Sequence, residues 1–294
     1  MTHLLALLGI LIISFSAILV RLADVSPAGA AFFRMAYAVP VLAAIWLAGR
    51  SSDRRTMPQH LMAAAAGFIL ATDLTLWHRS IGLIGAGLAT VLANIQVVVV
   101  GVLAWLLHRE RPTAAALATI PAVLAGVVLI SGLGRTDAYG SDPVPGALLG
   151  AAAGALYAIF LVFFRASNRG LAPPAGPLLD ATLGAAAGAL LYGSFDPVFT
   201  LVPAWPEHGW LLLLALLPQT AGWLLIARTL PRLPALETSV MLLMQPAATL
   251  LWGILIFGES LSLLQGTGVL LVLGGVAVIT RSGAVEPVPE SAEP

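Results

Sequence analysis

Two stretches of this sequence are similar to each other and decide the fold. Residues 79–130 read RSIGLIGAGLATVLANIQVVVVGVLAWLLHRERPTAAALATIPAVLAGVVLI, and residues 228–279 read RTLPRLPALETSVMLLMQPAATLLWGILIFGESLSLLQGTGVLLVLGGVAVI. They align without a gap at a constant offset of 149. The matches that carry weight are Gln96 with Gln245, Glu110 with Glu259, and Gly126 with Gly275. Apolar residues agree easily by chance, so these polar and glycine matches are the ones that predict an internal duplication.

The composition places this duplication in a membrane. Of the 294 residues, 59% are hydrophobic and 10% are charged, whereas about 25% are charged in soluble proteins. So few charges cannot cover a soluble surface of this size, while a surface that faces lipid needs none. The 14 basic residues balance the 14 acidic ones, which argues against a nucleic-acid partner. The absence of cysteine excludes a disulfide scaffold and thiol chemistry.

Apolar stretches of about 20 residues, the length that crosses a bilayer as a helix, occupy most of the chain. Ten such spans are predicted, at residues 3–23, 28–48, 59–80, 86–107, 114–133, 145–165, 174–194, 208–228, 234–257 and 263–280. Their apolar runs do not alternate with polar residues, which argues against a membrane β-barrel. The sequence therefore predicts an all-α polytopic membrane protein.

The arginines indicate how these helices are oriented. Ten of them flank one set of alternate connections, namely Arg50, Arg54, Arg55, Arg109, Arg111, Arg165, Arg169, Arg228, Arg232 and Arg281. Only Arg21, Arg79 and Arg135 flank the other set. Because arginine is enriched on the cytoplasmic side of membranes, we expect both termini to be cytoplasmic.

Five helices per repeat is an odd number, so the second repeat must enter the membrane from the opposite side. We predict two inverted five-helix repeats around a central cavity, at residues 1–136 and 137–281, followed by a disordered cytoplasmic tail at 282–294. Inverted repeats of this kind are typical of transporters that work by alternating access. A duplicated scaffold or a membrane-embedded enzyme is the alternative, although no motif for phosphate binding, metal ligation or a catalytic triad is present, and no cofactor is expected.

The chain from His3 to Arg281 resembles the EamA-like ten-helix exporters of the drug/metabolite transporter superfamily. The resemblance rests on the two five-helix halves and on the paired segments Leu-His-Arg-Glu110-Arg-Pro and Ile-Phe-Gly-Glu259-Ser-Leu. In that family a helix commonly ends in a Gly-Glu turn, and the first half departs from it with Arg109 in place of glycine. The resemblance implies a multi-pass protein of the bacterial inner membrane. It is nearest to exporters of aromatic and other neutral amino acids, with efflux of drugs or other metabolites as the alternative.

Two charged residues lie inside predicted spans, where ionisable groups are costly and usually functional. Arg34 and Asp73 both lie roughly 10 Å below the outer surface, at 1.5 Å per residue. They can form a fixed ion pair between two helices, or act on the substrate. A functional Asp73 can hold a substrate ammonium or carry a proton. The first span offers Ser14 and Ser16 where small multidrug members of the superfamily carry a glutamate, so proton-coupled and facilitated export both stay open.

Gln96 and Gln245 lie near the middle of the fourth and ninth spans, and each can line the cavity or join helices by a hydrogen bond. At 100° per residue, Asn94 and Gln96 point about 200° apart and cannot face the same lumen. The ninth span carries a polar stripe at helical spacing, and such a stripe should face water or protein rather than lipid. This stripe consists of Thr238, Met241, Gln245, Thr249 and Trp252.

Aromatic residues complete the candidate site. Tyr37 and Tyr157 are predicted near the midplane, Trp77 shares a helical face with Asp73, and Trp223 shares one with Gln219. Rings beside polar groups suit amphipathic solutes such as amino acids, although plain helix packing is the alternative. His78 closes the third span near the outer rim, where it can recognise a carboxylate during release or meet lipid head groups. Trp205 is expected to be an interfacial anchor.

Overall fold

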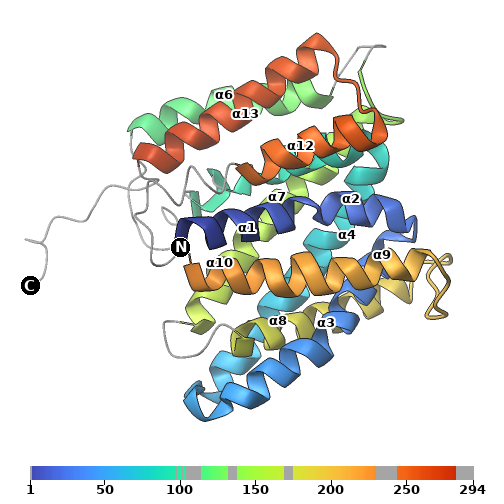
Figure 1. The fold of residues 1–294 in the computed structure, drawn as a ribbon. Coiled ribbons are helices and arrows are strands. Elements are labelled where there is room, and N and C mark those ends of the chain that lie inside the picture. Colours follow the sequence, from blue (N-terminus) through green and yellow to red (C-terminus); the bar gives the residue numbers. More distant parts are fainter. Residues whose placement is uncertain are drawn as a thin grey trace, which may run out of the picture.

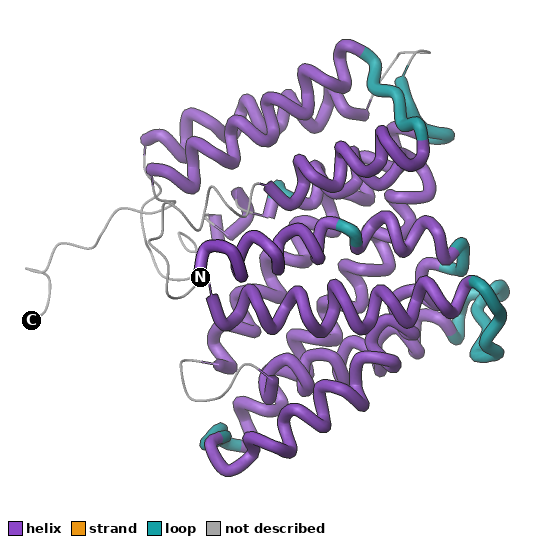
Figure 2. Tube along the Cα trace, viewed as in Figure 1, coloured by secondary structure: helices purple, strands orange, loops and turns teal. Residues whose placement is uncertain are grey.

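The computed structural model describes residues 2–96, 98–100, 102–103, 114–131, 138–168, 175–229 and 244–282. The helices in these ranges (Figure 1) are α1 Thr2–Ser14, α2 Ser16–Ala23, α3 Pro27–Gly49, α4 Met57–Ala93, α6 Ala114–Ser131, α7 Pro143–Asn168, α8 Ala175–Gly193, α9 Glu207–Leu214, α10 Trp223–Thr229, α12 Met244–Phe257 and α13 Leu263–Ser282. A short 3₁₀ turn, Arg50–Ser52, follows α3, and a π-helical segment, Ala215–Gly222, joins α9 to α10. No strand occurs within the described ranges (Figure 2), which confirms the predicted all-α fold.

Helix starts follow from local sequence. Ser26 caps α3, because its Oγ accepts a hydrogen bond from the Gly29 N–H at 3.1 Å, and Pro27 occupies the first helical position, where no N–H is needed. Thr56 and Gln59 form a capping box at the start of α4. These caps place the short turns that separate one membrane crossing from the next.

Each of the ten predicted spans contains helix among the described residues. Five described segments are long and apolar enough to cross a bilayer by themselves, and three further apolar helices are shorter. The 37 residues of α4 would extend about 55 Å as one helix, far more than a bilayer core of about 30 Å. Gly85 divides it, because its φ of 83° reverses the chain. The third and fourth crossings therefore meet at Gly85.

The first crossing differs from the prediction of one uninterrupted helix. Phe15 separates α1 from α2, so the carbonyl of Ser14 is free to accept a hydrogen bond from Thr249 Oγ1 at 2.8 Å. Trp252 Nε1 donates to Ser14 Oγ at 3.0 Å, and its ring stacks on Phe15 at 4.9 Å between centroids. The break thus allows the first crossing to bond to the ninth crossing, which contains α12. Two members of the polar stripe, Thr249 and Trp252, therefore contact protein at this point.

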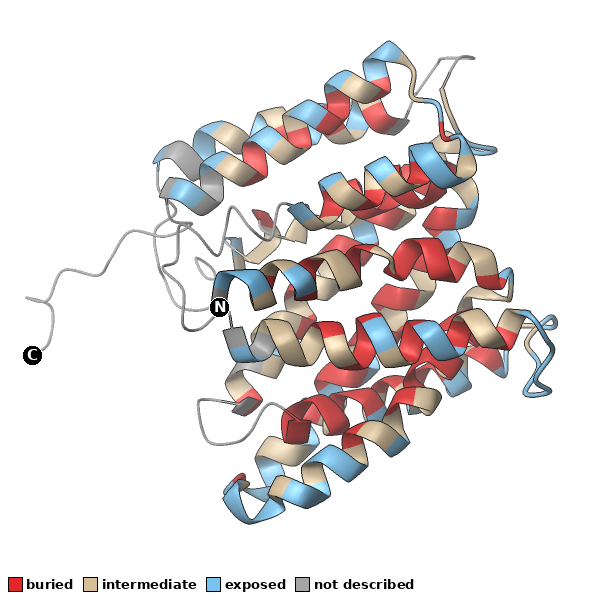
Figure 3. Ribbon diagram, viewed as in Figure 1, coloured by how far each residue is buried: buried red, intermediate tan, exposed pale blue. Residues whose placement is uncertain are grey.

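Closely packed helix pairs mostly join the first half of the chain with the second. The most extensive packing is of α4 on α7 and α8, of α6 on α13, and of α3 on α8. In Figure 3, buried residues lie where helices meet, and exposed residues lie on outward faces of α3 and α13. The exposed residues include Leu263 and Leu270, which a surface facing lipid tolerates.

The pair α6 and α13 shows the internal symmetry directly. An added Cβ on Gly126 would touch Val272, and an added Cβ on Gly275 would touch Val123. Val123 and Val272 are related by the same offset of 149 as Gly126 and Gly275. Residues that exchange partners in this way are the signature of two-fold packing. The two repeats therefore pack about a local two-fold axis at these helices.

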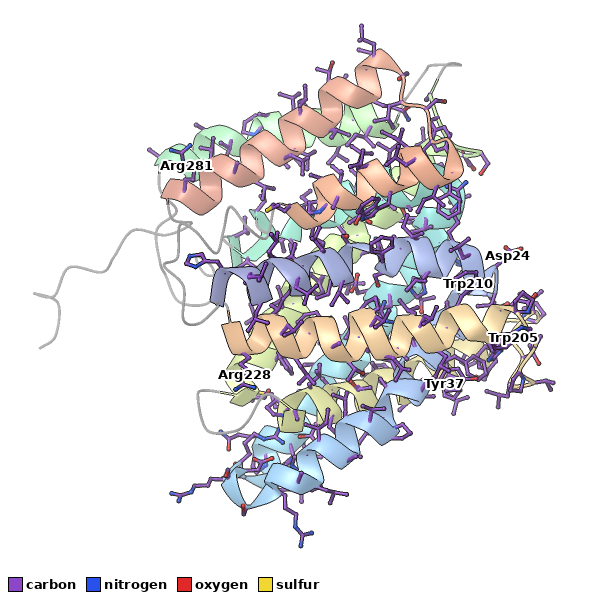
Figure 4. The ribbon with its side chains drawn as sticks, in the orientation of Figure 1. Asp24, Tyr37, Trp205, Trp210, Arg228 and Arg281 are labelled. Atoms are coloured by element: carbon purple, nitrogen blue, oxygen red, sulfur yellow. The ribbon has the colours of Figure 1, made fainter. Side chains whose placement is uncertain are left out.

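A buried network lies where α3 ends and α4 and α8 begin. The Arg55 guanidinium bonds to Asp53 Oδ2 at 2.8 Å and to Asp180 Oδ2 at 2.6 Å, and its side chain is wholly buried. Asp180 also bonds to His60 Nδ1 at 2.7 Å, and Asp53 accepts from Trp46 Nε1 at 2.9 Å. Hydrogen bonds from Arg55 hold the pKa of the Asp53 carboxyl well below its usual range. This network joins the two repeats at the end of the bundle that carries Arg228 and Arg281 (Figure 4).

A second buried network lies at the opposite end of the bundle, which carries Asp24 and Trp205. The Glu259 carboxylate accepts from the backbone N–H groups of Ala86 at 2.7 Å and Gly87 at 3.0 Å, and it pairs with Arg21 at 2.5 Å. A carboxylate at a helix N-terminus is favourable, because the first N–H groups lack helical partners. The acidic turn of the second repeat is therefore a cap for the fourth crossing, a role that the sequence did not reveal. Its repeat mate Glu110 lies outside the described residues.

Candidate functional site

Arg34 is the centre of the candidate site. It lies on α3 and is 4% exposed. Its Nη2 donates to Gln219 Oε1 at 2.9 Å, while Nε and Nη1 have no hydrogen-bond partner. No ion pair joins Arg34 to Asp73, although the two charges are near enough to interact electrostatically. The fixed ion pair considered from the sequence is therefore absent, and Gln219 is the group that holds the guanidinium.

Gln219 reaches Arg34 from an unusual segment of the eighth crossing. Residues Ala215–Gly222 form a π-helix that contains Pro218, and Thr220 Oγ1 donates to the Ala215 carbonyl at 2.7 Å. A π turn contains more residues than an α turn, so it changes the direction of the side chains that follow, and such turns are frequent at functional sites. Spacing by 3.6 residues could not predict this geometry. The one sign of it in the sequence is Pro218, because proline interrupts regular α-helical hydrogen bonding.

Asp73 faces the same region from α4. It is 5% exposed, and it lies near Arg34 and Tyr157. Tyr157 belongs to α7, and its ring lies 5.6 Å from Phe160 and 6.4 Å from Trp223 between centroids. The structure thus brings a carboxylate, a phenol and an indole from three crossings to one place, with aromatic rings behind them.

Trp77 and His78 extend this region toward the start of α3. Both are buried, at 8% and 4% exposed, and their rings lie 5.5 Å apart. His78 Nδ1 lies 3.1 Å from the Pro27 carbonyl. A carbonyl can only accept, so Nδ1 carries the hydrogen of this bond. Trp77 Nε1 and His78 Nε2 have no hydrogen-bond partner. Because His78 is buried, it does not meet lipid head groups.

Four crossings from both repeats contribute to this set of residues, which we call the buried polar cluster. The cluster consists of Arg34, Asp73, Trp77, His78, Tyr157, Gln219 and Trp223. It holds one guanidinium, one carboxylate, unpartnered N–H donors and three large rings. Within the described part of the chain, no group of three His, Asp or Glu residues is placed to hold a metal ion.

Tyr37 does not turn toward Gln219. Its hydroxyl pairs with His208 Nδ1 at 2.7 Å, at the start of α9. Its ring also lies 5.5 Å from Phe33. Figure 4 places Tyr37 toward the end of the bundle that carries Trp205, which is 82% exposed there, as an interfacial residue would be. Tyr37 therefore pairs with His208 and does not contact Gln219, whereas its position near the midplane stays a prediction.

Gln96 and Gln245 stand apart from the buried polar cluster. Asn94 Nδ2 bonds to the Thr90 carbonyl of its own helix at 2.8 Å, whereas Gln96 Oε1 is buried without a partner. Which of these two neighbours faces the cavity stays open. Gln245 is half-buried in the first turn of α12, next to the contact with Ser14. The stripe residues Thr238 and Met241 lie outside the described residues.

Comparison with known proteins follows the same division into halves. No curated protein matches the chain. One solved crystal structure is similar over 95% of this chain and 96% of its own, with 21% identity and a TM-score of 0.63, which supports the fold alone. The EamA-like transporter family matches twice, over residues 1–132 and 144–281. The chain therefore belongs to the EamA-like transporter family, and it is a membrane transporter of small molecules.

Proposed function

We propose that this protein exports amino acids, preferably aromatic and other neutral ones, by alternating access. The observation that carries the proposal is the buried polar cluster. It holds a positive and a negative side chain that are both almost fully buried and that do not pair with each other. Burying a charge without a partner costs roughly several kcal/mol. A ligand that carries a negative group for Arg34 and a positive group for Asp73 explains this arrangement best.

A zwitterionic amino acid has the required chemistry. Its carboxylate and ammonium complement Arg34 and Asp73, and its side chain can lie against the rings of Tyr157, Phe160 and Trp223. A site of mixed apolar rings and a few polar groups is typical of small-molecule binding. An aromatic or aliphatic side chain would fit such rings, whereas a charged one would lack a partner among them.

Burial of the cluster supports alternating access. Arg34, Asp73 and His78 are each about 95% buried or more, so a solute reaches them only when helices move apart. Helices of both repeats surround them, and two inverted repeats can exchange conformations so that one midplane site opens first to one side and then to the other. The repeats are proposed to comprise residues 1–136 and 137–281, followed by the cytoplasmic tail at 282–294, of which residues 283–294 lie outside the described residues.

Export of drugs or other metabolites is the second candidate within transport. A phosphate-rich solute would need several basic groups, and Arg34 is the only arginine in the buried polar cluster. An uncharged drug would leave both charges of the cluster without partners. A membrane-embedded enzyme or scaffold is disfavoured, because the cluster lacks an evident nucleophile and base in contact.

Sidedness is proposed from the arginines. Arg228 and Arg281 lie at the end of the bundle where α1 begins (Figure 4), and enrichment of arginine marks the cytoplasmic side. Both termini are then in the cytoplasm, and the bacterial inner membrane that the family resemblance implies is the proposed location. Asp73 is the proposed proton carrier if export is proton-coupled, and facilitated export is the alternative.

The test is efflux from liposomes that contain the purified protein. They are loaded with a panel of labelled amino acids, and efflux is measured with and without an imposed pH gradient. Protein-dependent efflux of aromatic and neutral amino acids is expected. No efflux of any amino acid would refute the substrate assignment, and efflux that ignores the gradient would remove the proton role of Asp73.

A further inference from the structure

Arg34 has hydrogen-bonding capacity that the protein does not use. Gln219 Oε1 occupies Nη2 at 2.9 Å, while Nε and Nη1 are buried without a partner. A buried donor left unsatisfied has lost its hydrogen bonds to water without replacement, and this loss is larger when the donor is charged. Most buried polar groups in proteins are paired, so each exception calls for an explanation. It is therefore unusual that two nitrogens of one buried guanidinium lack hydrogen bonds.

No acceptor among the described residues forms a hydrogen bond with Nε or Nη1 of Arg34. Asp73 and His78 are both near enough to interact electrostatically with Arg34, yet neither is hydrogen-bonded to it, and His78 Nε2 is itself unpartnered. Gln219 is neutral, so it fixes the guanidinium without cancelling its charge. The positive charge thus stays available to an anionic group.

We propose that Arg34 is the carboxylate subsite of the transporter: the solute's carboxylate accepts hydrogen bonds from the free N–H groups of Arg34, and its ammonium lies toward Asp73. Gln219 acts as a positioning residue that holds the guanidinium in place. This inference rests on the proposed function and specifies it, because it makes a free carboxylate a condition of transport.

The charge balance of the cluster gives the selectivity. An amino acid brings one charge of each sign and pairs both Arg34 and Asp73. An amino acid amide or an amine pairs only Asp73 and leaves the guanidinium unpaired. A simple carboxylic acid pairs only Arg34 and leaves the carboxylate unpaired. Buried polar groups that lose their partners give strong discrimination, so we expect each of these analogues to bind at least about tenfold more weakly than the amino acid.

The wild-type protein in liposomes tests this directly. Efflux of labelled phenylalanine is measured while unlabelled phenylalanine, phenylalaninamide, phenethylamine or 3-phenylpropionate competes. Only unlabelled phenylalanine should compete at low concentration. If phenylalaninamide competes equally well, the carboxylate subsite is wrong while amino acid export stands. If no labelled phenylalanine leaves the liposomes, the proposed function itself fails for this solute, and the same competition is run with another amino acid that is exported.

A variant that adds a negative charge beside Arg34 gives a second test. Gln219→Glu places a carboxylate against Arg34, so it should raise the KM for phenylalanine about tenfold or more and improve competition by phenethylamine relative to phenylalanine. A residue with only a structural role would lower transport without changing this preference. Gln59→Glu is the matched control, because glutamate serves equally in the capping box at the start of α4. An unchanged preference in a folded Gln219→Glu protein would overturn the positioning role.

Discussion

Helices α4 and α8 pack so closely that a single added methyl group, at Gly67 of α4, should destabilise the protein. A Cβ added to Gly67 would collide with the Ala181 carbonyl oxygen and lie 2.7 Å from its carbonyl carbon. The reciprocal contact is equally close, because a Cβ on Gly184 would collide with the carbonyl of Ala64. Carbon atoms prefer a separation of about 3.5–4.0 Å. Gly67→Ala therefore requires these helices to move apart by about 1 Å.

The cost of this movement follows from packing. A gap of about 1 Å forfeits up to half of the dispersion energy of the contacts that it opens. Helices in membranes have little hydrophobic drive to associate, so close packing of small residues carries much of their affinity. We expect Gly67→Ala to lower the free energy of unfolding by about 3 kcal/mol, the upper end for overpacking, which is about a hundredfold in the equilibrium constant.

Reversible unfolding of the purified protein in mixed micelles, followed by circular dichroism, measures this effect. Gly82→Ala on the same helix is the matched control, because a Cβ there meets nothing within 4 Å. Alanine at such a site should be neutral or stabilise the protein by up to about 1 kcal/mol. Equal stability of the Gly67→Ala and Gly82→Ala proteins would refute the close packing of α4 on α8.

Three further predictions concern the Arg55 network and the candidate cavity. Arg55→Gln should cost about 3 kcal/mol of stability, because it removes the cationic partner that Asp53 and Asp180 share, whereas Arg50→Gln at an exposed position should be nearly neutral in the same unfolding assay. Because the folded pKa of Asp53 is depressed, its contribution should persist above about pH 4, near the pKa of an unfolded aspartate, and be lost as pH falls further. Acid unfolding of Asp53→Asn should lack that loss, and an identical acid profile would contradict the role assigned to Asp53. In liposome efflux at equal expression, Gln245→Ala should slow transport more than Trp205→Ala, and the reverse order would count against a cavity beside Gln245.

The helices and their arrangement in two repeats were predictable, because both leave patterns that can be read directly from the sequence. Apolar length defines a membrane crossing, and a gapless repeat with matching Gln, Glu and Gly residues defines the symmetry. The contact of Gly126 with Val272 and its mate, Gly275 with Val123, realises that symmetry in the structure.

The site was predictable only in part. The sequence marked Arg34 and Asp73 as buried charges, and the structure places both in one cluster. It did not predict that Gln219 would hold Arg34, because this contact depends on a π-helical segment that no regular periodicity describes. Nor did it predict the break at Phe15, which depends on tertiary hydrogen bonds from Thr249 and Trp252. Contacts made across helices far apart in the chain leave no local signal.

Inversion of the two repeats is the central claim, and the chain's lack of cysteine makes it directly testable. Ser51 lies exposed in the connection between α3 and α4, and Ser194 lies exposed in the connection between α8 and α9, at the corresponding place in the second repeat. Single variants Ser51→Cys and Ser194→Cys are labelled in intact cells with a membrane-impermeant maleimide. The account predicts that Ser194→Cys is labelled from outside and that Ser51→Cys is labelled only after the cells are opened. Labelling of both cysteines from the same side of the membrane would contradict it.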